Sequence, residues 1–142
     1  MITLAEIQAT GLPLTDHGAI ADALSAGRTK VISREVGDGA ISIALGTPAG
    51  PIFMLQLEQI ANTPVTEATP PELVAQIAVA RQAWRSINRV GFDVGDPGVR
   101  AGIDAMVGTL LTAEQAEAIK ALAVVPDPVT PVDVQRVIDG AV

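Results

Sequence analysis

Apolar side chains recur along this chain at the three- and four-residue spacing of amphipathic α-helices. The spacing is clearest over residues 70–90, where four, three, four and three residues separate Leu73, Ile77, Ala80, Trp84 and Ile87. Such spacing places all five side chains on one helix face. The segment from Pro51 to Ile60 is apolar almost all round, so we expect it to be central and to pack against this face. A further inward stripe is expected at Val99, Ile103, Met106 and Leu110.

Several helix starts are predicted where a residue that can cap a helix is followed by proline. A Thr or Asp side chain at the N-cap accepts a hydrogen bond from a free backbone N–H, and proline suits the first helical position. Four such pairs begin at Thr47, Thr69, Asp96 and Thr130, and capping boxes are predicted from Thr3, Thr69 and Thr112. With glycines marking several ends, helices are predicted at residues 3–10, 16–26, 38–45, 48–62, 70–90, 97–110, 113–123 and 131–139.

These patterns predict an all-α fold. We expect a compact bundle of about six to eight short helices in a single helical domain spanning residues 1–142. At most one short strand-like segment is expected, near residues 29–36, where β-branched residues alternate roughly with polar ones before Gly37. Residues 1–36 could form an extended N-terminal interaction arm.

Composition indicates a thin core. Hydrophobic residues make up 49% of the chain, but only 2% of residues are aromatic, and 23 are alanine. Small side chains favour helices and their close approach, but each buries little apolar area. We expect the core to include Ile52, Leu55, Leu73, Ile77, Trp84 and Ile103. Part of the stability could then come from a partner surface.

The charge of the chain argues against several classes of partner. The net charge of −7 disfavours binding to nucleic-acid phosphates and to anionic membrane surfaces. The longest uninterrupted apolar run is four residues, from Ile52 to Leu55, which is too short for a membrane span. We therefore expect no nucleic-acid partner and no membrane partner.

The basic residues form two groups that are candidates for partner binding. Arg81, Arg85 and Arg89 recur every fourth residue and form a stripe along one helix face. This stripe is either a solvated flank or a docking site for an acidic partner.

The second group is Arg28, Lys30 and Arg34, which surround Ile32 in the strand-like segment. If this segment has no strand partner within the chain, its backbone groups must pair elsewhere. The segment is then expected to lie at an inter-subunit contact.

No catalytic, cofactor-binding or metal-binding residues are predicted. The chain has no cysteine and a single histidine, His17, so thiolate chemistry and a site of two histidines are excluded. The glycines from Gly37 to Gly50 match neither the P-loop nor the dinucleotide-binding spacing. A calcium loop starting at Asp93 is a weak alternative to a helix N-cap at Asp96, because the intervening residues offer few oxygens. No small-molecule substrate is expected, although a small enzyme stays open as a third possibility.

The segment from Leu111 to Ile138, "LTAEQAEAIKALAVVPDPVTPVDVQRVI", resembles the C-terminal part of small accessory proteins encoded by tailed bacteriophages. The segment "SREVGDGAISIALG" is also similar to phage sequences. The resemblance implies a non-enzymatic structural protein of a bacteriophage particle, made in the host bacterial cytoplasm and located in the virion. It would bind copies of itself, as a homo-oligomer, or a capsid, neck or tail protein. The alternative is a soluble assembly chaperone or adaptor that is absent from the mature particle.

Overall fold

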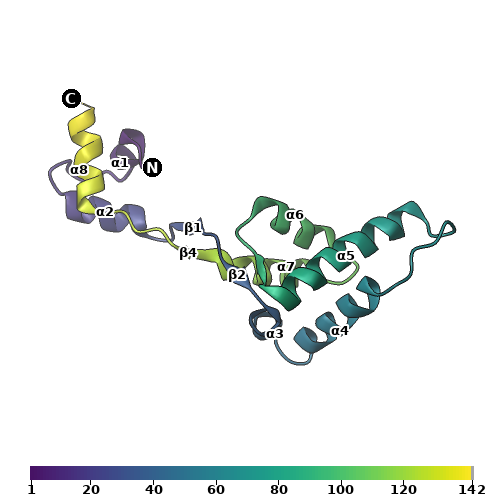
Figure 1. The fold of residues 1–142 in the computed structure, drawn as a ribbon. Coiled ribbons are helices and arrows are strands. Elements are labelled where there is room, and N and C mark those ends of the chain that lie inside the picture. Colours follow the sequence, from purple (N-terminus) through teal and green to yellow (C-terminus); the bar gives the residue numbers. More distant parts are fainter. Residues whose placement is uncertain (142) are drawn as a thin grey trace. The chain divides into compact units, whose positions relative to one another are not determined.

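The protein is described by a computed structural model covering residues 1–141, and it is mostly helical (Figure 1). The α-helices are α1 (Leu4–Ala9), α2 (His17–Ser25), α3 (Asp38–Leu45), α4 (Ala49–Ala61), α5 (Pro71–Arg89), α6 (Pro97–Ala105), α7 (Ala113–Lys120) and α8 (Pro131–Gly140). A 3₁₀ turn, η1 (Ala121–Ala123), follows α7. All eight predicted helices are present. The largest difference in length is at α6, which ends at Ala105, because the chain turns at Met106 and Gly108 adopts a positive φ of 88°.

Most of the predicted helix starts are confirmed. Complete capping boxes begin α1 at Thr3, α7 at Thr112 and α8 at Thr130. At the start of α6, the Asp96 carboxylate accepts hydrogen bonds from two backbone N–H groups. These signals are local, because each cap is made within four consecutive residues.

Two predicted caps are wrong. The Thr69 hydroxyl oxygen accepts from the backbone N–H of Thr66 instead of capping α5, whose N-cap residue is Pro70. Thr47 stands one residue before Pro48, the N-cap residue of α4. At Thr69 the preceding turn therefore takes the hydroxyl oxygen that a cap would need.

The chain contains more strand than the single segment predicted near 29–36. That segment divides into β1 (Thr29–Val31) and β2 (Glu35–Val36), and two further strands are β3 (Phe92–Asp93) and β4 (Val124–Pro126). β1 neighbours β4, and β2 pairs antiparallel with β3, with Glu35 opposite Asp93 and Val36 opposite Phe92. The fold is therefore mainly helical with two small two-stranded sheets. The premise that residues 29–36 lack a partner within the chain is wrong.

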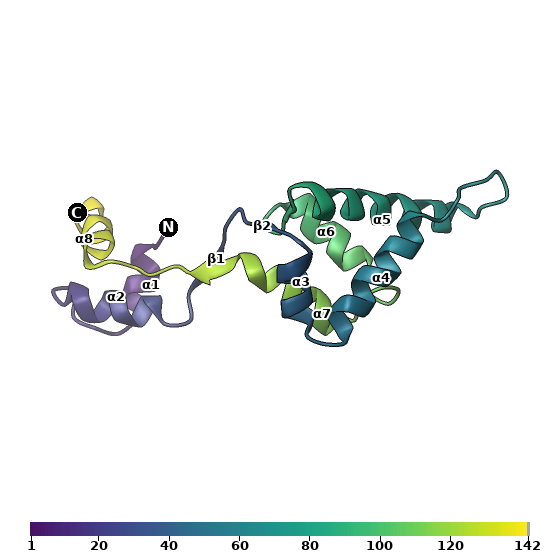
Figure 2. The ribbon, with the colours of Figure 1, turned by 60° about the horizontal axis from the view of Figure 1, so that its bottom comes forward.

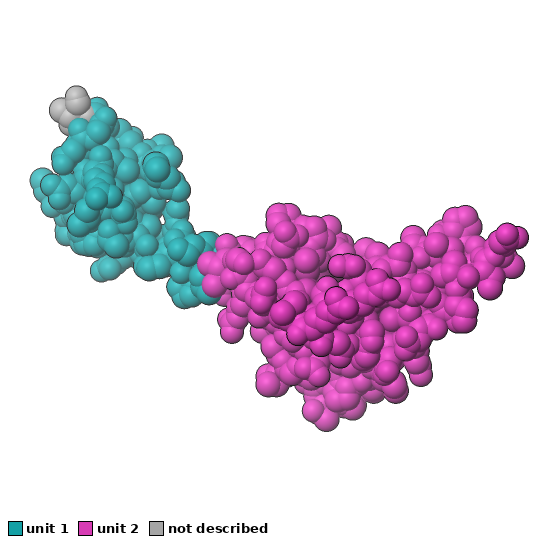
Figure 3. Space-filling view, viewed as in Figure 1, with its two compact units in different colours: residues 1–30, 125–142 teal, residues 31–124 magenta. Residues whose placement is uncertain are grey.

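The domain organisation differs from a single bundle with an N-terminal arm. The chain divides into two compact units, coloured separately in Figure 3. Unit 1 comprises residues 1–30 and 125–142, and unit 2 comprises residues 31–124. Residues 1–30 thus fold as helices with the C-terminal segment.

Unit 1 is built from α1, α2 and α8. Its core consists of Ile2, Ile7, Ile20, Ala21 and Val134, all buried. Helices α2 and α8 pack together although they lie more than one hundred residues apart in the sequence. The Ser25 hydroxyl joins them further, because it accepts from the backbone N–H of Val129 at 2.8 Å.

Unit 2 is built from α3 to α7, with α4 packed against α5 (Figure 2). Its core confirms the stripe at Val99, Ile103, Met106 and Leu110, and it also contains Phe53, Leu57, Ala80, Ile87 and Val94. Ile77 and Ile103 are buried as predicted. Three residues expected in the core, Ile52, Leu55 and Leu73, are exposed instead. The helix α4 buries one face, through Phe53 and Leu57, and its other apolar face is exposed to solvent.

Candidate protein-binding groove

The residues around β1 were predicted to bind a partner, and the structure places their polar groups in contacts within the chain. In unit 1, the Arg28 guanidinium donates to Asp127 at 3.2 Å and lies 3.8 Å from Glu6. The Lys30 ammonium lies 3.5 Å from the other oxygen of Asp127. The hydrogen bond from Arg28, with Lys30 as a second cation, holds the pKa of Asp127 below its usual range.

In unit 2, Ile32 and Arg34 are also held by the chain itself. The backbone N–H of Ile32 donates to the carbonyl of Ala123, and the Arg34 guanidinium donates to the carbonyl of Leu122. The backbone N–H of Arg34 donates to the Asp93 carboxylate at 2.7 Å. These contacts pair the polar groups of Ile32 and Arg34 within the chain, so no strand from another subunit is needed to pair them.

The three arginines of the stripe predicted on α5 have different environments in the structure. Arg81 is half-buried and donates to the carbonyls of Ala61 and Thr63, both at 2.8 Å, so it caps the C-terminal end of α4. Arg85 and Arg89 are exposed and form no ion pair with any residue from 1 to 141. Arg81 therefore has a structural role, and Arg85 and Arg89 are the two free cations of the predicted stripe.

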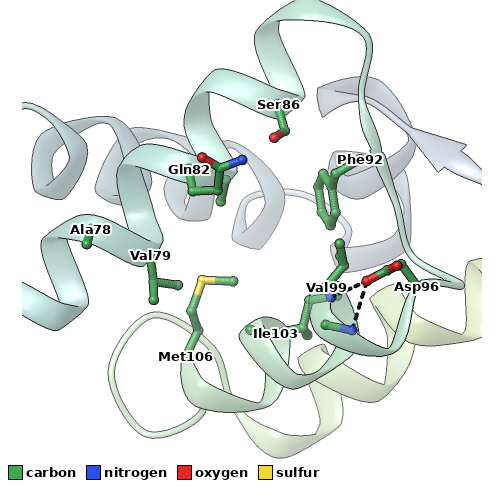
Figure 4. A pocket seen from close by; sticks show the side chains of 12 residues that line it. Ala78, Val79, Gln82, Ser86, Phe92, Asp96, Val99, Ile103 and Met106 are labelled. Carbon is green, nitrogen blue, oxygen red and sulfur yellow. Dashed lines mark hydrogen bonds between the residues drawn. The ribbon is translucent and has the colours of Figure 1, made fainter.

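A groove with a volume of about 510 Å³ lies between α5 and α6, and Arg85 lies outside it, in a separate hollow with Ala61, Asn62, Arg81 and Trp84. Figure 4 shows Val79 and Gln82 of α5 on one side, Met106, the C-cap residue after α6, opposite Val79, and Phe92 beyond Gln82. We call it the α5/α6 groove, and its lining residues are Ala78, Val79, Gln82, Ala83, Ser86, Phe92, Asp96, Gly98, Val99, Gly102, Ile103 and Met106.

The lining of the α5/α6 groove suits apolar contact. Asp96 is its only titratable side chain, and that carboxylate already accepts from the N–H groups of Gly98 and Val99, at 2.8 and 3.1 Å. Gln82 and Ser86 supply its other polar side-chain groups. An apolar floor with a few polar groups at its margin can bind an apolar side chain or a helix face.

Sequence reasoning found one wall of this groove but did not recognise the groove. Val99, Ile103 and Met106 were predicted to face inward, which they do. The glycine pair Gly98 and Gly102, four residues apart on the same face of α6, was the missed signal. Because glycine has no side chain, the pair leaves space between α6 and α5 that larger residues would fill.

The other sequence-level candidates occupy structural positions. His17 is the first residue of α2 and is half-buried. The Asp93 carboxylate accepts from Ser33, Arg34 and Gly95, and Asp104 pairs with Lys120 at 2.7 Å. Within residues 1–141, no group of three or more His, Asp or Glu side chains is placed to hold a metal ion. None of the helices described there combines the length and apolar character needed to cross a bilayer.

Comparison with known proteins gives no match: no protein-family model, curated protein or solved structure shows significant similarity to this chain.

Proposed function

We propose that this chain is a non-enzymatic structural protein of a bacteriophage particle, located in the virion. It binds copies of itself or a capsid, neck or tail protein, with no nucleic-acid, membrane or small-molecule partner. The resemblance of residues 111–138 to phage accessory proteins supports the phage assignment. The α5/α6 groove supports the binding role.

The observation that carries this proposal is an apolar groove formed in part by α5, a helix that also carries two free cations. The groove is lined largely by Ala, Val, Gly, Met, Ile and Phe side chains. Arg85 and Arg89 are exposed and free of ion pairs within residues 1–141. Apolar contact at the centre with charged groups at the rim is the usual organisation of a protein–protein interface.

The proposal is tested by mass spectrometry of purified particles of the phage that encodes the chain. We expect the protein at a stoichiometry fixed relative to the major capsid protein. A particle that lacks it would contradict the structural role and would support the alternative, an assembly chaperone that uses the same groove and then leaves.

A variant in the groove tests whether binding uses this surface. Gly102→Gln places a side chain in the groove, and a Cβ at Gly102 meets no atom within 4 Å. Because glutamine is also the better helix former, the variant should fold normally and be depleted from particles. Gly39→Gln is the matched control, since a Cβ at Gly39 also meets no atom within 4 Å and Gly39 lies outside the groove. Normal incorporation of the groove variant would exclude this surface.

A further inference from the structure

We infer that a hollow between the end of α4 and the middle of α5 binds a carboxylate side chain from an acidic segment of another protein. The hollow shares no lining residue with the α5/α6 groove, so it is a second binding surface, and it does not depend on the role proposed for that groove. It has a volume of about 280 Å³, we call it the arginine hollow, and its lining residues are Ala61, Asn62, Arg81, Trp84 and Arg85.

The charged groups of the arginine hollow are all positive. Arg81 and Arg85 are its two ionisable side chains, and no Asp or Glu lines it. A guanidinium has five N–H donors and no acceptor, and the Asn62 amide adds two more donors. A ligand with negatively charged oxygens therefore matches both the charge and the hydrogen-bonding groups of the hollow.

Arg81 is held in place by the end of α4. Its Nε donates to the carbonyl of Ala61 and its Nη2 to the carbonyl of Thr63, both at 2.8 Å. These two bonds leave three N–H groups, including both on Nη1, without a partner within residues 1–141. A side chain that is fixed before binding loses less conformational freedom when a ligand binds. Arg81 is therefore a pre-positioned cation on one wall of the hollow.

Arg85 supplies the charge that makes the hollow attractive to an anion. The carbonyls at the C-terminal end of α4 carry a partial negative charge of about one half, and Arg81 is already bound to them. Arg85 is exposed and lies one turn further along α5. Neither arginine forms an ion pair within residues 1–141, although the chain has 16 acidic residues. The positive charge is therefore available to a carboxylate from outside the chain.

Trp84 and the size of the hollow favour a protein side chain as the source of this carboxylate. Trp and Arg are among the residues most enriched at the energetic centres of protein interfaces, and here the single tryptophan lies beside two arginines. Trp84 is half-buried against the core of unit 2, so its accessible surface can contact the carbon atoms of a Glu or Asp side chain. Sites for drug-sized ligands begin at about 300 Å³, and the hollow is slightly smaller.

The charge of the rest of the chain favours a short acidic segment over a long polyanion. With a net charge of −7, the chain repels a nucleic acid along most of its length. The same background repulsion disfavours acidic segments everywhere except near local positive charge. The arginine hollow therefore specifies the position at which such a segment binds.

Peptide titration of the purified full chain tests the inference. The probe is a peptide of alternating glycine and glutamate with acetylated and amidated ends, and the control peptide has glutamine in place of glutamate. Because Trp84 is the only tryptophan, its emission reports on the hollow, and calorimetry gives the affinity. We expect saturable binding of the glutamate peptide with a shift in Trp84 emission, and no binding of the glutamine peptide at equal ionic strength. Absence of binding, or equal binding of both peptides, would overturn the inference.

Two matched arginine variants locate the binding. Arg85→Gln should keep the fold, because Arg85 is exposed and unpaired within residues 1–141, and it should weaken peptide binding by about tenfold or more. Arg89→Gln is the control, since it makes the same charge change on the same helix outside the hollow. At physiological salt it should change the affinity by less than about twofold. Equal losses in the two variants would overturn the assignment to the hollow.

Two further results would identify a different occupant. Tighter binding of inorganic phosphate than of the glutamate peptide would indicate a phosphate site. Oligomers of the wild type that Arg85→Gln dissociates, measured by sedimentation velocity, would indicate an acidic segment of a second copy. Either result would overturn the assignment to another protein. These tests use no phage particles, so their failure leaves the proposed function standing, and absence of the protein from particles would leave peptide binding unaffected.

Discussion

At the scale of single residues, close backbone approach fixes the position of β3 and the residues on either side of it. A Cβ added at Gly95 would lie 2.0 Å from the carbonyl oxygen of Ile32, and one at Gly91 would lie 2.5 Å from that of Val36. Gly91 also has a positive φ of 85°, which side chains other than glycine rarely adopt. The two glycines therefore allow residues 32–36 to lie directly against residues 91–95.

We expect Gly95→Ala to destabilise unit 2 by about 1–3 kcal/mol, because the backbone must move to make room for the methyl group. Urea unfolding followed by the fluorescence of Trp84, the chain's single tryptophan, measures this change. Gly39→Ala is the control. It lies in α3 with open space around the added Cβ, so we expect it to be neutral or stabilising. Equal stability of the two variants would contradict the close approach.

The Asp93 carboxylate strengthens the same junction. It accepts from the Ser33 hydroxyl and from the backbone N–H groups of Arg34 and Gly95. These bonds, led by the one from Ser33, favour the ionised form and hold the pKa of Asp93 below its usual range. A group whose pKa is depressed by folding contributes stability above its unfolded pKa, about 3.9 for Asp, and loses it as the pH falls through the folded value.

We therefore expect the stability difference between the wild type and Asp93→Asn to be largest near neutral pH. The difference should shrink as the pH falls below about 4, because the wild-type carboxylate then becomes neutral too. Urea unfolding at a series of pH values measures it. Glu67→Gln, in the exposed turn before α5, is the control and should show no such dependence. A pH-independent deficit in Asp93→Asn would mean that the ionised form is not favoured.

At the scale of elements, helix positions could be predicted from the sequence because their signals are local. Thr112 forms its capping box with Gln115 as predicted, and Thr130, predicted as an N-cap, forms one with Asp133. Thr69 carries the same residue pattern, yet its hydroxyl bonds to Thr66 in the preceding turn. The sequence pattern indicates which residues are able to cap a helix. Whether they do depends on whether a neighbouring turn competes for the same side-chain oxygen.

We expect Thr112→Ala to cost about 0.5–2 kcal/mol, the usual effect of losing an N-cap. Thr69→Ala should cost less, because the bond it removes belongs to an exposed turn and not to a helix end. Thermal or urea unfolding of both variants, followed by circular dichroism, measures the difference. A larger loss at Thr69 than at Thr112 would mean that Thr69 caps α5 in solution.

The strands and the groove could not be predicted in the same way, because both are non-local. β2 and β3 contain two residues each, and they pair across more than fifty residues of chain. The walls of the α5/α6 groove come from two helices whose relative position depends on the core. The exposure of Ile52 and Leu55 also depends on which face of an apolar helix is covered, and the sequence of α4 does not distinguish its faces.

At the scale of the whole molecule, the chain has two separate hydrophobic cores. Every fully buried residue of one core belongs to unit 1, and every fully buried residue of the other belongs to unit 2. The core of unit 1 consists of Ile2, Ile7, Ile20, Ala21 and Val134. A core this small leaves little stability in reserve, since conformational entropy opposes most of what apolar burial contributes.

We expect Ile20→Ala to unfold unit 1 while unit 2 stays folded. Ile20 is fully buried, and an Ile→Ala change in a core costs about 2–5 kcal/mol, which is comparable with the total stability of a small domain. Circular dichroism should lose the signal of α1, α2 and α8, and the fluorescence of Trp84 in unit 2 should keep its native wavelength. Ile103→Ala, in the core of unit 2, should instead shift the urea transition reported by Trp84. If Ile20→Ala changes the fluorescence and the helix content together, the two cores unfold as one cooperative structure, and the division into units has no energetic meaning.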